Sequence, residues 1–564
     1  MTNSMPIWPA VSSALDPNTQ MFPALTPAQI DRIRAVSKLR KVQVGDILFR
    51  PGDVGIPFFV VLSGCLEVVQ IGLGVERLIV THCSGSFTGE LNTLSGQRSL
   101  VLGRISEPGE FLELSVEGLR ALIARDAELS EVLMRAFILR RLALITNQLG
   151  DVILMGSRHS AGTLRLREFL GRNGYPYNYV DLDTDKTSQE LLDRFSVKLE
   201  EIPVVICNGN QVLRNPTPQQ LADCLGMNVN IDNDHVRDLI IVGAGPSGLA
   251  AAVYAASEGL DALLVENEAP GGQAGSSSKI ENYLGFPTGV SGQELASRAL
   301  TQAMKFGAKM MVAHSVQKLA CDRRPYKLLL DDGTALAARA IVIATGAQYK
   351  KPAIANLKKF EGQGVYYGAT YIEAQLCGNE DVIVVGGGNS AGQAAVYLSQ
   401  TARKVYMLVR SSSLADTMSR YLIQRIAQNP AIELHFLTEL VNLDGDTHLD
   451  RVTWIDKATG QTSSHDIRHV FIMAGAAPRT DWLRGCVALD DKGFILTGRD
   501  LDMLTTTDGS PVWPLPRSPQ MLETSLPGVF AVGDVRAGNV KRVASAVGEG
   551  AISVHLVHRS LAEA

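Results

Sequence analysis

The sequence predicts a multidomain chain in which a β-roll (jelly-roll) with helices precedes three α/β units. Its 564 residues are enough for about four domains of ordinary size. Short apolar runs separated by glycine turns fill Val42 to Leu112, and strand and helix patterns alternate in the rest. A buried-strand pattern, a glycine-rich turn and a helix pattern occur together twice, after Asp238 and after Asp381. Two of the α/β units are therefore expected to be Rossmann-like.

Composition and charge narrow the possible partners. A net charge of −5 gives no electrostatic case for binding nucleic acid or an anionic membrane. No apolar run reaches the ~18 residues that a membrane span requires. The seven cysteines are scattered and no two have C-x-x-C spacing, which excludes the usual dithiol and a cysteine metal site, so no metal is expected. This odd, dispersed set suits a reducing cytoplasm, the location we expect.

The N-terminal third is expected to begin with a flexible leader at residues 1–20, which is rich in Pro, Ser and Asn. A helix should follow from Thr26 to about Ser37, because Thr26 can cap it, Pro27 suits its first position and Gln29 completes a capping box. After the β runs, a helix pattern extends from Val116 to about Gln148. We therefore expect one domain over residues 21–150.

Four short motifs in this domain resemble the cyclic nucleotide-binding domain family. They are Pro51-Gly52-Asp53, Leu62-Ser63-Gly64, Gly89-Glu90-Leu91 and Arg98-Ser99. The resemblance implies a ligand site at Gly89, Glu90, Arg98 and Ser99, with Glu90 on the ribose 2′-hydroxyl and Arg98 on the cyclic phosphate. Leu100 departs from the family, which usually has a small residue there, and its bulk could crowd the phosphate. The alternative is a β-roll kept for packing or dimerisation, with Glu90 and Arg98 as a salt bridge.

Residues 151–227 alternate strand and helix patterns and contain Ile202-Pro203, features that resemble the thioredoxin/glutaredoxin fold, in which this proline is cis. A helix is expected at Ser188–Phe195 within this unit. Active members of that family carry C-x-x-C before the first helix, where this chain has Ser157-Arg158-His159-Ser160. Serine cannot form a disulfide, so we expect an inert spacer or interaction module, followed by a linker at 228–236.

The stretch from Asp238 to Glu266 has every part of a dinucleotide-binding motif. A buried strand leads to glycines at 243, 245 and 248, then to a helix and a second strand that ends on Glu266. Gly243 permits the tight turn, Gly245 lets a pyrophosphate approach, and Gly248 allows close helix–strand packing. Glu266 can accept hydrogen bonds from ribose hydroxyls.

A second such motif begins at Asp381. Its turn and helix start place Gly386, Gly388, Asn389 and Ser390 around a dinucleotide phosphate. The strand that follows ends at Val409, and the next residue is Arg410, followed by serines. A cation suits a 2′-phosphate better than a free 2′-hydroxyl, so NADPH is favoured over NADH.

Together with Pro270-Gly271-Gly272-Gln273, Ile280-Glu281-Asn282-Tyr283 and Val532-Gly533-Asp534, these motifs resemble the pyridine nucleotide–disulfide oxidoreductases, closest to the low-molecular-weight thioredoxin reductases. The resemblance implies a homodimer with FAD at Gly272, Gln273, Asn282 and Asp534, and Arg542 near the flavin. It also implies a discontinuous FAD domain, 237–350 and 479–564, enclosing an NADPH domain at 351–478.

One departure from that family bears on the mechanism. The family places C-x-x-C just before the second glycine turn, but here Gly368-Ala369-Thr370-Tyr371 occupies the position. The first hypothesis is that reduced FAD passes electrons to a separate, unidentified acceptor, and that a cyclic nucleotide regulates the transfer. The second is a thioredoxin-disulfide reductase that uses a non-standard thiol such as Cys377. The third is a non-enzymatic redox or ligand sensor.

Overall fold

The computed structural model describes residues 20–72, 75–95, 97–147, 150–158, 160–183, 201–207, 211–228, 231–232, 234–502, 504–505 and 509–563. Most of the expected leader, His159 and the helix expected at Ser188–Phe195 lie outside these residues.

The N-terminal β-rich unit contains two antiparallel sheets. One has the order β1 (Lys38–Val42), β7 (Gly109–Leu114), β3 (Phe58–Val61), and the other β2 (Ile47–Phe49), β6 (Leu102–Glu107), β4 (Cys65–Gly72), β5 (Val75–His82). Helix α2 (Pro27–Arg34) begins with the predicted capping box at Thr26. The long helix expected after Val116 is two helices, α4 (Val116–Arg125) and α5 (Ala127–Thr146). The break falls at Asp126, whose extended backbone and carboxylate cap α5.

A four-stranded unit follows in the described part of residues 150–228. Its sheet has the order β11 (Gln211–Arg214), β10 (Val204–Cys207), β8 (Val152–Gly156), β9 (Asn178–Asp181), with β8 and β9 parallel. Helices α6 (Ala161–Arg172) and α8 (Pro218–Cys224) accompany it. The peptide bond before Pro203 is cis, as the sequence predicts. These elements match the predicted order wherever the residues are described.

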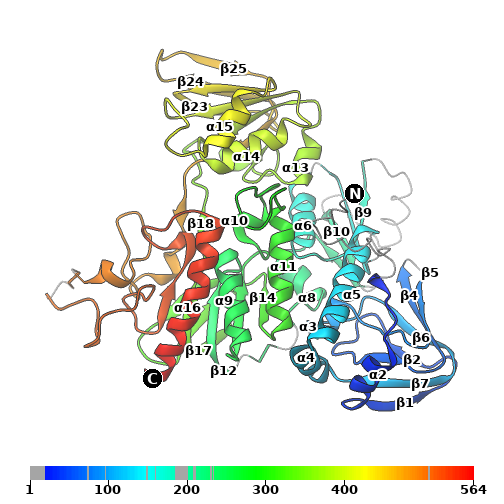
Figure 1. Cartoon of the computed structure of the whole chain (residues 1–564). Helices are drawn as coiled ribbons and strands as arrows, with labels where there is room; N and C mark the ends of the chain where they lie inside the picture. Colours follow the sequence, from blue (N-terminus) through cyan, green and yellow to red (C-terminus); the bar gives the residue numbers. More distant parts are fainter. Residues whose placement is uncertain are drawn as a thin grey trace, which may run out of the picture.

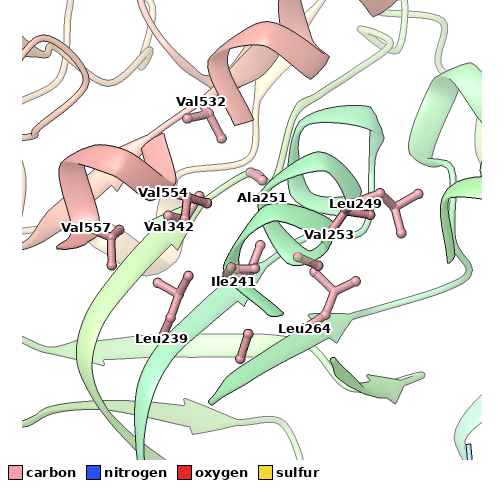
Figure 2. Close-up of a cluster of buried hydrophobic side chains, with 14 of the residues drawn as sticks. Leu239, Ile241, Leu249, Ala251, Val253, Leu264, Val342, Val532, Val554 and Val557 are labelled. Atoms are coloured by element: carbon pink, nitrogen blue, oxygen red, sulfur yellow. The ribbon is translucent and has the colours of Figure 1, made fainter. Parts of the chain in front are cut away.

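The central sheet has the order β14 (Lys309–Val312), β13 (Ala262–Glu266), β12 (Val236–Val242), β17 (Ala335–Ile343), β16 (Tyr326–Leu330), β15 (Val316–Ala320). Strand β28 (Val529–Ala531) comes almost two hundred residues after β17 and pairs with it in parallel. Helices α9 (Pro246–Ser257), α11 (Gly292–Lys305) and α16 (Val543–Glu563) cover one face. Figure 2 shows how Leu239, Val342 and Val554 from three of these elements meet in one buried cluster.

The upper part of the molecule in Figure 1 holds a parallel sheet of order β19 (Val365–Tyr366), β26 (His469–Ile472), β20 (Asp381–Val385), β21 (Lys404–Val409), β22 (Ile432–Phe436). An antiparallel sheet of β23 (Thr438–Asp444), β24 (Arg451–Asp456) and β25 (Thr462–His465) adjoins it. Helices α13 (Tyr371–Leu376), α14 (Asn389–Leu398) and α15 (Arg420–Ala427) belong to this part. Two chain segments connect this part to the central sheet, and they pair with each other through the short strands β18 (Ala347–Gln348) and β27 (Ala477–Pro478).

The four-stranded unit lies between the β-rich unit and the central sheet, as Figure 1 shows. One hydrophobic cluster spans all three, with Leu100 from the first, Leu154 from the second and Val312 from β14. The side chain of Asn228 bonds to the edge of β14. Its Nδ2 donates to Val312 O (3.0 Å), and its Oδ1 accepts from Val312 N (2.8 Å). The three parts therefore share a core, which holds the four-stranded unit in place.

Four of the seven cysteines form disulfides, which the dispersed spacing did not predict. Cys65 pairs with Cys83, and Cys321 pairs with Cys486. The first pair follows from strand register, since the β4–β5 hairpin places Leu66 opposite His82. The second joins residues 165 positions apart and depends on the tertiary fold. Within the described ranges, no helix is long and apolar enough to cross a membrane.

Candidate active site

The first glycine turn, between β12 and α9, is closed to side chains except at one point. Gly243 has φ +103°, and a Cβ there would lie 2.5 Å from the carbonyl oxygen of Ala344. A Cβ on Gly248 would lie 1.8 Å from the carbonyl oxygen of Gly243. A Cβ on Gly245, by contrast, would meet nothing within 4 Å. The open position is the one where a ligand's phosphates can approach the backbone.

Gly245 is also the N-cap of α9, and Pro246 follows at the first helical position. The free N–H groups and positive dipole end of this helix therefore face the open space. The loop of α10 (Gly272–Gly275) lies directly beside it: Gly271 N donates to Ala244 O at 2.7 Å. The two glycine-rich segments thus form one cradle suited to an anion.

Glu266 lies at the end of β13, as predicted, and fixes this cradle. Its carboxylate accepts from Ala244 N (2.7 Å) and from Glu268 N (2.9 Å). The side chain is buried, and burial raises the pKa of Glu266 although both backbone hydrogen bonds oppose the rise. The role of Glu266 as a ribose ligand stays a prediction, and the structure adds that its carboxylate holds the turn in shape.

A cavity of about 790 Å³ extends from this cradle toward the second glycine turn. It is lined by ten residues that the sequence singled out: Gly243, Gly245, Glu266, Gly272, Gln273, Asn282, Asn389, Ser390, Asp534 and Arg542. Gly248, Gly386, Gly388 and Arg410 do not line it. Burial raises the pKa of Asp534, a rise that the charge of Lys541 opposes. The volume falls in the usual range for a cofactor site.

The second turn repeats the design of the first. Gly386 has φ +145°, and a Cβ there would lie 2.6 Å from Met473 O, whereas a Cβ on Gly388, the N-cap of α14, would come no closer than 4.0 Å, to Thr417 O. The side-chain oxygen Oδ1 of Asn389 already has a partner within the protein, because it accepts from Ser419 N at 2.7 Å. Arg410 directly follows β21 and is exposed.

The loop that replaces the expected cysteines lies against the first cradle. A Cβ on Gly368 would be 3.8 Å from the Cβ of Ser276, and Gly368 lines the cavity. The next part of the loop is held by Glu373, whose carboxylate accepts from Thr370 N at 2.9 Å. The position that a thiol pair would need is therefore occupied by a hydrogen-bonded turn without sulfur.

Cys377, the candidate substitute thiol, lies away from solvent. Its side chain is fully buried, and its thiol donates to the Glu373 carbonyl at 3.1 Å. Burial raises the pKa of Cys377, and the nearby charges of Glu380 and Glu373 raise it further. A buried thiol with a raised pKa is disfavoured as an attacking thiolate, and a reductase that acts through Cys377 stays an untested prediction.

Helix α6 forms a wall of the cavity that the sequence analysis missed. Arg165, Glu168 and Arg172 line the cavity at the spacing of one helix face. Arg172 donates to Gly272 O at 3.1 Å, so the four-stranded unit contacts the first cradle directly. Burial and the charge of Glu373 raise the pKa of Glu168. The spacing of these charged residues along one helix face could have indicated this wall from the sequence. The interpretation of the unit as an inert spacer did not use it.

Comparison with known proteins agrees with this geometry. Residues 237–550 match the family model described as pyridine nucleotide-disulphide oxidoreductase. The chain belongs to this family. Residues 39–126 match the model of the cyclic nucleotide-binding domain.

The family relatives that the chain resembles are thioredoxin reductases. That of Treponema pallidum is 33% identical over 319 residues, 56% of this chain and 95% of the relative. That of Bacillus subtilis is 30% identical over 334 residues, 59% and 97% of the two chains. Crystal structures of thioredoxin reductases from Lactococcus lactis and T. acidophilum superpose with TM-scores of 0.51 over 58% of this chain, at 26% and 27% identity. Oxidoreductases of this kind use FAD and NADPH, so the chain is an NAD(P)H-dependent flavin oxidoreductase.

In the cyclic nucleotide-binding domain, the residues expected to hold the ligand already have protein partners. Arg98 is buried and pairs with Asp151 of the four-stranded unit at 3.0 Å. Its Nε and Nη2 donate to the Tyr175 hydroxyl (3.1 and 2.6 Å), and Nη1 donates to Cys224 O (3.3 Å). In this arrangement Arg98 is engaged by the protein, and its predicted role as the ligand of a cyclic phosphate stays a prediction.

Glu90 is likewise occupied. It pairs with Arg141 of α5 at 3.6 Å, not with Arg98 as the packing alternative had it. Burial raises the pKa of Glu90 against the opposing charge of Arg141. Gly89 has φ +102° and lies against the Phe137 ring, and Ser99 Oγ donates to Val101 O at 2.8 Å. Leu100 is buried in the cluster shared with the four-stranded unit, which gives this departure from the family a packing role.

Proposed function

We propose that the chain transfers reducing equivalents from NADPH through FAD to an acceptor other than a C-x-x-C disulfide of its own. The observation that carries the proposal is one cavity that extends from the first glycine turn to Asn389 and Ser390 beside the second, with no cysteine in its wall where the family has two. Cys377 is a poor substitute because it is buried and burial raises the pKa of its thiol. The flavin itself is then the point from which electrons leave.

The residues of the first cradle fit FAD. Open space at Gly245 and the N-terminus of α9 would receive the pyrophosphate, and Glu266 would accept from the ribose. Gly272, Gln273, Asn282, Asp534 and Arg542 line the same cavity and would contact the rest of the cofactor. Bound FAD supplies the hydride chemistry, and these side chains supply binding, orientation and electrostatics.

The second cradle would hold the nicotinamide cofactor. Gly386 and Gly388 shape the turn, and Asn389 and Ser390 begin the helix that faces its phosphates. Exposed Arg410 at the end of β21 would pair with a 2′-phosphate, which favours NADPH over NADH.

The acceptor would approach the flavin through the space that Gly368, Glu168 and Arg165 border. These residues bring positive and negative charge to the border of the space and no thiol. The space therefore suits a small polar oxidant or an electron-transfer partner better than a dithiol substrate. Glu168, whose pKa is raised by burial, would be placed to deliver a proton to an acceptor that is reduced by two electrons.

The domain organisation is part of the proposal. A cyclic nucleotide-binding domain (21–150), a thioredoxin-like domain without active-site cysteines (151–227) and a linker (228–236) precede an FAD domain (237–350 and 479–564). That domain encloses an NADPH domain (351–478), and the chain assembles as a homodimer. The pairing of β28 with β17 supports the discontinuous FAD domain. A cyclic nucleotide would regulate transfer by competing with Asp151 for Arg98.

Anaerobic mixing of the purified flavoprotein with NADPH tests the proposal at the flavin absorbance. We expect rapid bleaching with NADPH, and equally rapid bleaching in Cys377→Ser. The same variant should keep its activity with every acceptor that the wild type reduces. Failure of NADPH to bleach the flavin would refute the reductase function, and loss of acceptor turnover in Cys377→Ser alone would restore the thiol mechanism.

A further inference from the structure

Helix α6 of the four-stranded unit presents one face to the cofactor cavity. The residues at positions i, i+3, i+4, i+7 and i+11 line it: Ala161, Leu164, Arg165, Glu168 and Arg172. Residues with this spacing lie on one side of an α-helix. Figure 1 shows α6 beside α11, which belongs to the central α/β part. The four-stranded unit therefore closes one side of the cavity that begins at the first glycine turn.

The end of α6 is attached to the part of the chain that carries the first glycine turn. Gln293, in the first turn of α11, donates from its side-chain Nε2 to Gly171 O (3.3 Å) and to Arg172 O (2.9 Å). Asn173, which follows α6, donates from Nδ2 to Glu268 O at 3.2 Å. The last four carbonyls of a helix have no partner within it, so Gln293 satisfies two of these groups. These contacts fix the position of α6 relative to the first cradle.

Arg172 connects this end of α6 to the first cradle. Its Nη2 donates to Gly272 O (3.1 Å) and to Ala269 O (3.5 Å). Its Nη1 lies 3.5 Å from a carboxylate oxygen of Glu168 and 3.6 Å from one of Glu268. The side chain is only 14% exposed, and hydrogen bonds from a charged donor are stronger than those between neutral groups. The guanidinium therefore anchors both ends of the turn from Ala269 to Gly272.

This turn has a conformation that needs an anchor. Gly271 and Gly272 have φ +101° and +53°, and glycine loses more conformational freedom on folding than any other residue. Gly271 N donates to Ala244 O at 2.7 Å, and Arg172 supplies the second attachment. A Cβ on Gly272 would lie only 3.1 Å from the Cα of Gly245. A displacement of Gly272 therefore alters the open position where a pyrophosphate would approach.

We propose that α6 is part of the flavin site and that Arg172 is a positioning residue, which retains FAD by holding the turn from Ala269 to Gly272 in place. This inference rests on the proposed function, in which the first cradle holds FAD. Arg172 acts through the backbone carbonyls of the turn and needs no contact with the cofactor. The four-stranded unit then has a role that requires no cysteine, because it secures the cofactor of the domain that follows it.

The test measures FAD affinity in the full-length protein. Bound flavin is removed by dialysis against a chaotropic salt, and FAD is titrated back by isothermal titration calorimetry. We expect Arg172→Met to raise the Kd for FAD roughly tenfold, which corresponds to the loss of one charge-assisted hydrogen bond. Arg172→Lys should bind FAD with intermediate affinity, because an ammonium group can still donate to one carbonyl. Gln293→Leu, which changes the contact from the opposite side, should also raise the Kd.

Arg167→Met is the matched control. Arg167 also lies on α6, but its guanidinium lies over the Tyr179 ring, 4.3 Å from the ring centroid. This variant should bind FAD as tightly as the wild type. Unchanged FAD affinity in Arg172→Met would overturn the proposal, and so would an equal loss of affinity in Arg167→Met. If circular dichroism shows that Arg172→Met does not fold, Arg172→Lys and Gln293→Leu decide by the same criterion.

The titration needs no NADPH, so its outcome is separate from that of the reductase test. A wild type that binds no FAD would refute this proposal and the proposed function together. A wild type that binds FAD tightly, with equal affinity in Arg172→Met, would refute this proposal alone.

Discussion

The buried ion pair between Arg98 and Asp151 makes a quantitative prediction. The side chains are 5% and 4% exposed, and 3.0 Å separates Arg98 Nη2 from Asp151 Oδ2. Asp151→Asn keeps the shape but leaves a buried guanidinium without its counter-charge. Removal of one partner of a buried pair typically costs 3–5 kcal/mol. Because Arg98 keeps the Tyr175 hydroxyl and the Cys224 carbonyl, we expect the lower limit, about 3 kcal/mol.

Native-state hydrogen exchange measures this cost locally, which suits a chain of several domains. Amides of β6 and β8 should exchange roughly 150-fold faster in Asp151→Asn, since each 1.4 kcal/mol is about tenfold. Arg98→Met combined with Asp151→Asn should cost less than the sum of the single changes, because no unpaired charge remains.

An exposed pair whose arginine lies on β6 provides the matched control. Arg104 lies 3.1 Å from Glu67, and both side chains are more than a quarter exposed, so Glu67→Gln should cost less than about 1 kcal/mol. Strictly additive effects for Arg98 and Asp151, or exchange in Asp151→Asn no faster than in Glu67→Gln, would refute the ion pair as a structural lock.

Four further outcomes can be tested at other sites. Gly245→Val should leave the apoprotein stable, because a Cβ there meets nothing within 4 Å, but it should abolish flavin retention. Gly248→Ala should impair folding as well as flavin retention. Flavin content and circular dichroism distinguish the two variants. Arg410→Ala should raise the KM for NADPH roughly tenfold and leave that for NADH unchanged, which steady-state kinetics would contradict if both changed alike. Burial, aided by Arg140, lowers the pKa of His82 to about 3, so the unfolded state alone gains a proton as the pH falls below 6.5. Between pH 6.5 and 5 the wild type should therefore lose about 2 kcal/mol more stability than His82→Gln, and parallel pH profiles from urea unfolding would exclude this.

The sequence predicted the parts of the site that one segment of chain determines. The turn at Gly243 to Gly248 and the cap at Thr26 are local, because the residues that interact are three to five positions apart. Contacts between units were not predictable in this way. Arg98 meets Tyr175, 77 positions away, and Arg172 meets Gly272, 100 positions away. Sequence periodicity does not predict these contacts, because they depend on how the folded domains pack against one another.

The four-stranded unit connects the two proposed ligand sites by direct contact. Asp151 and Tyr175 hold Arg98 on one side, and Arg172 donates to Gly272 O of the first cradle on the other. A cyclic phosphate can reach Arg98 only in a state where Asp151 has released it, so ligand affinity is reduced by the rarity of that state. The same ligand should then shift α6 and the cavity wall that it forms. Asp151→Asn should therefore bind cyclic AMP or cyclic GMP more tightly and reproduce, without ligand, the ligand's effect on flavin reduction by NADPH. Tighter binding with an unchanged reduction rate would separate the two sites.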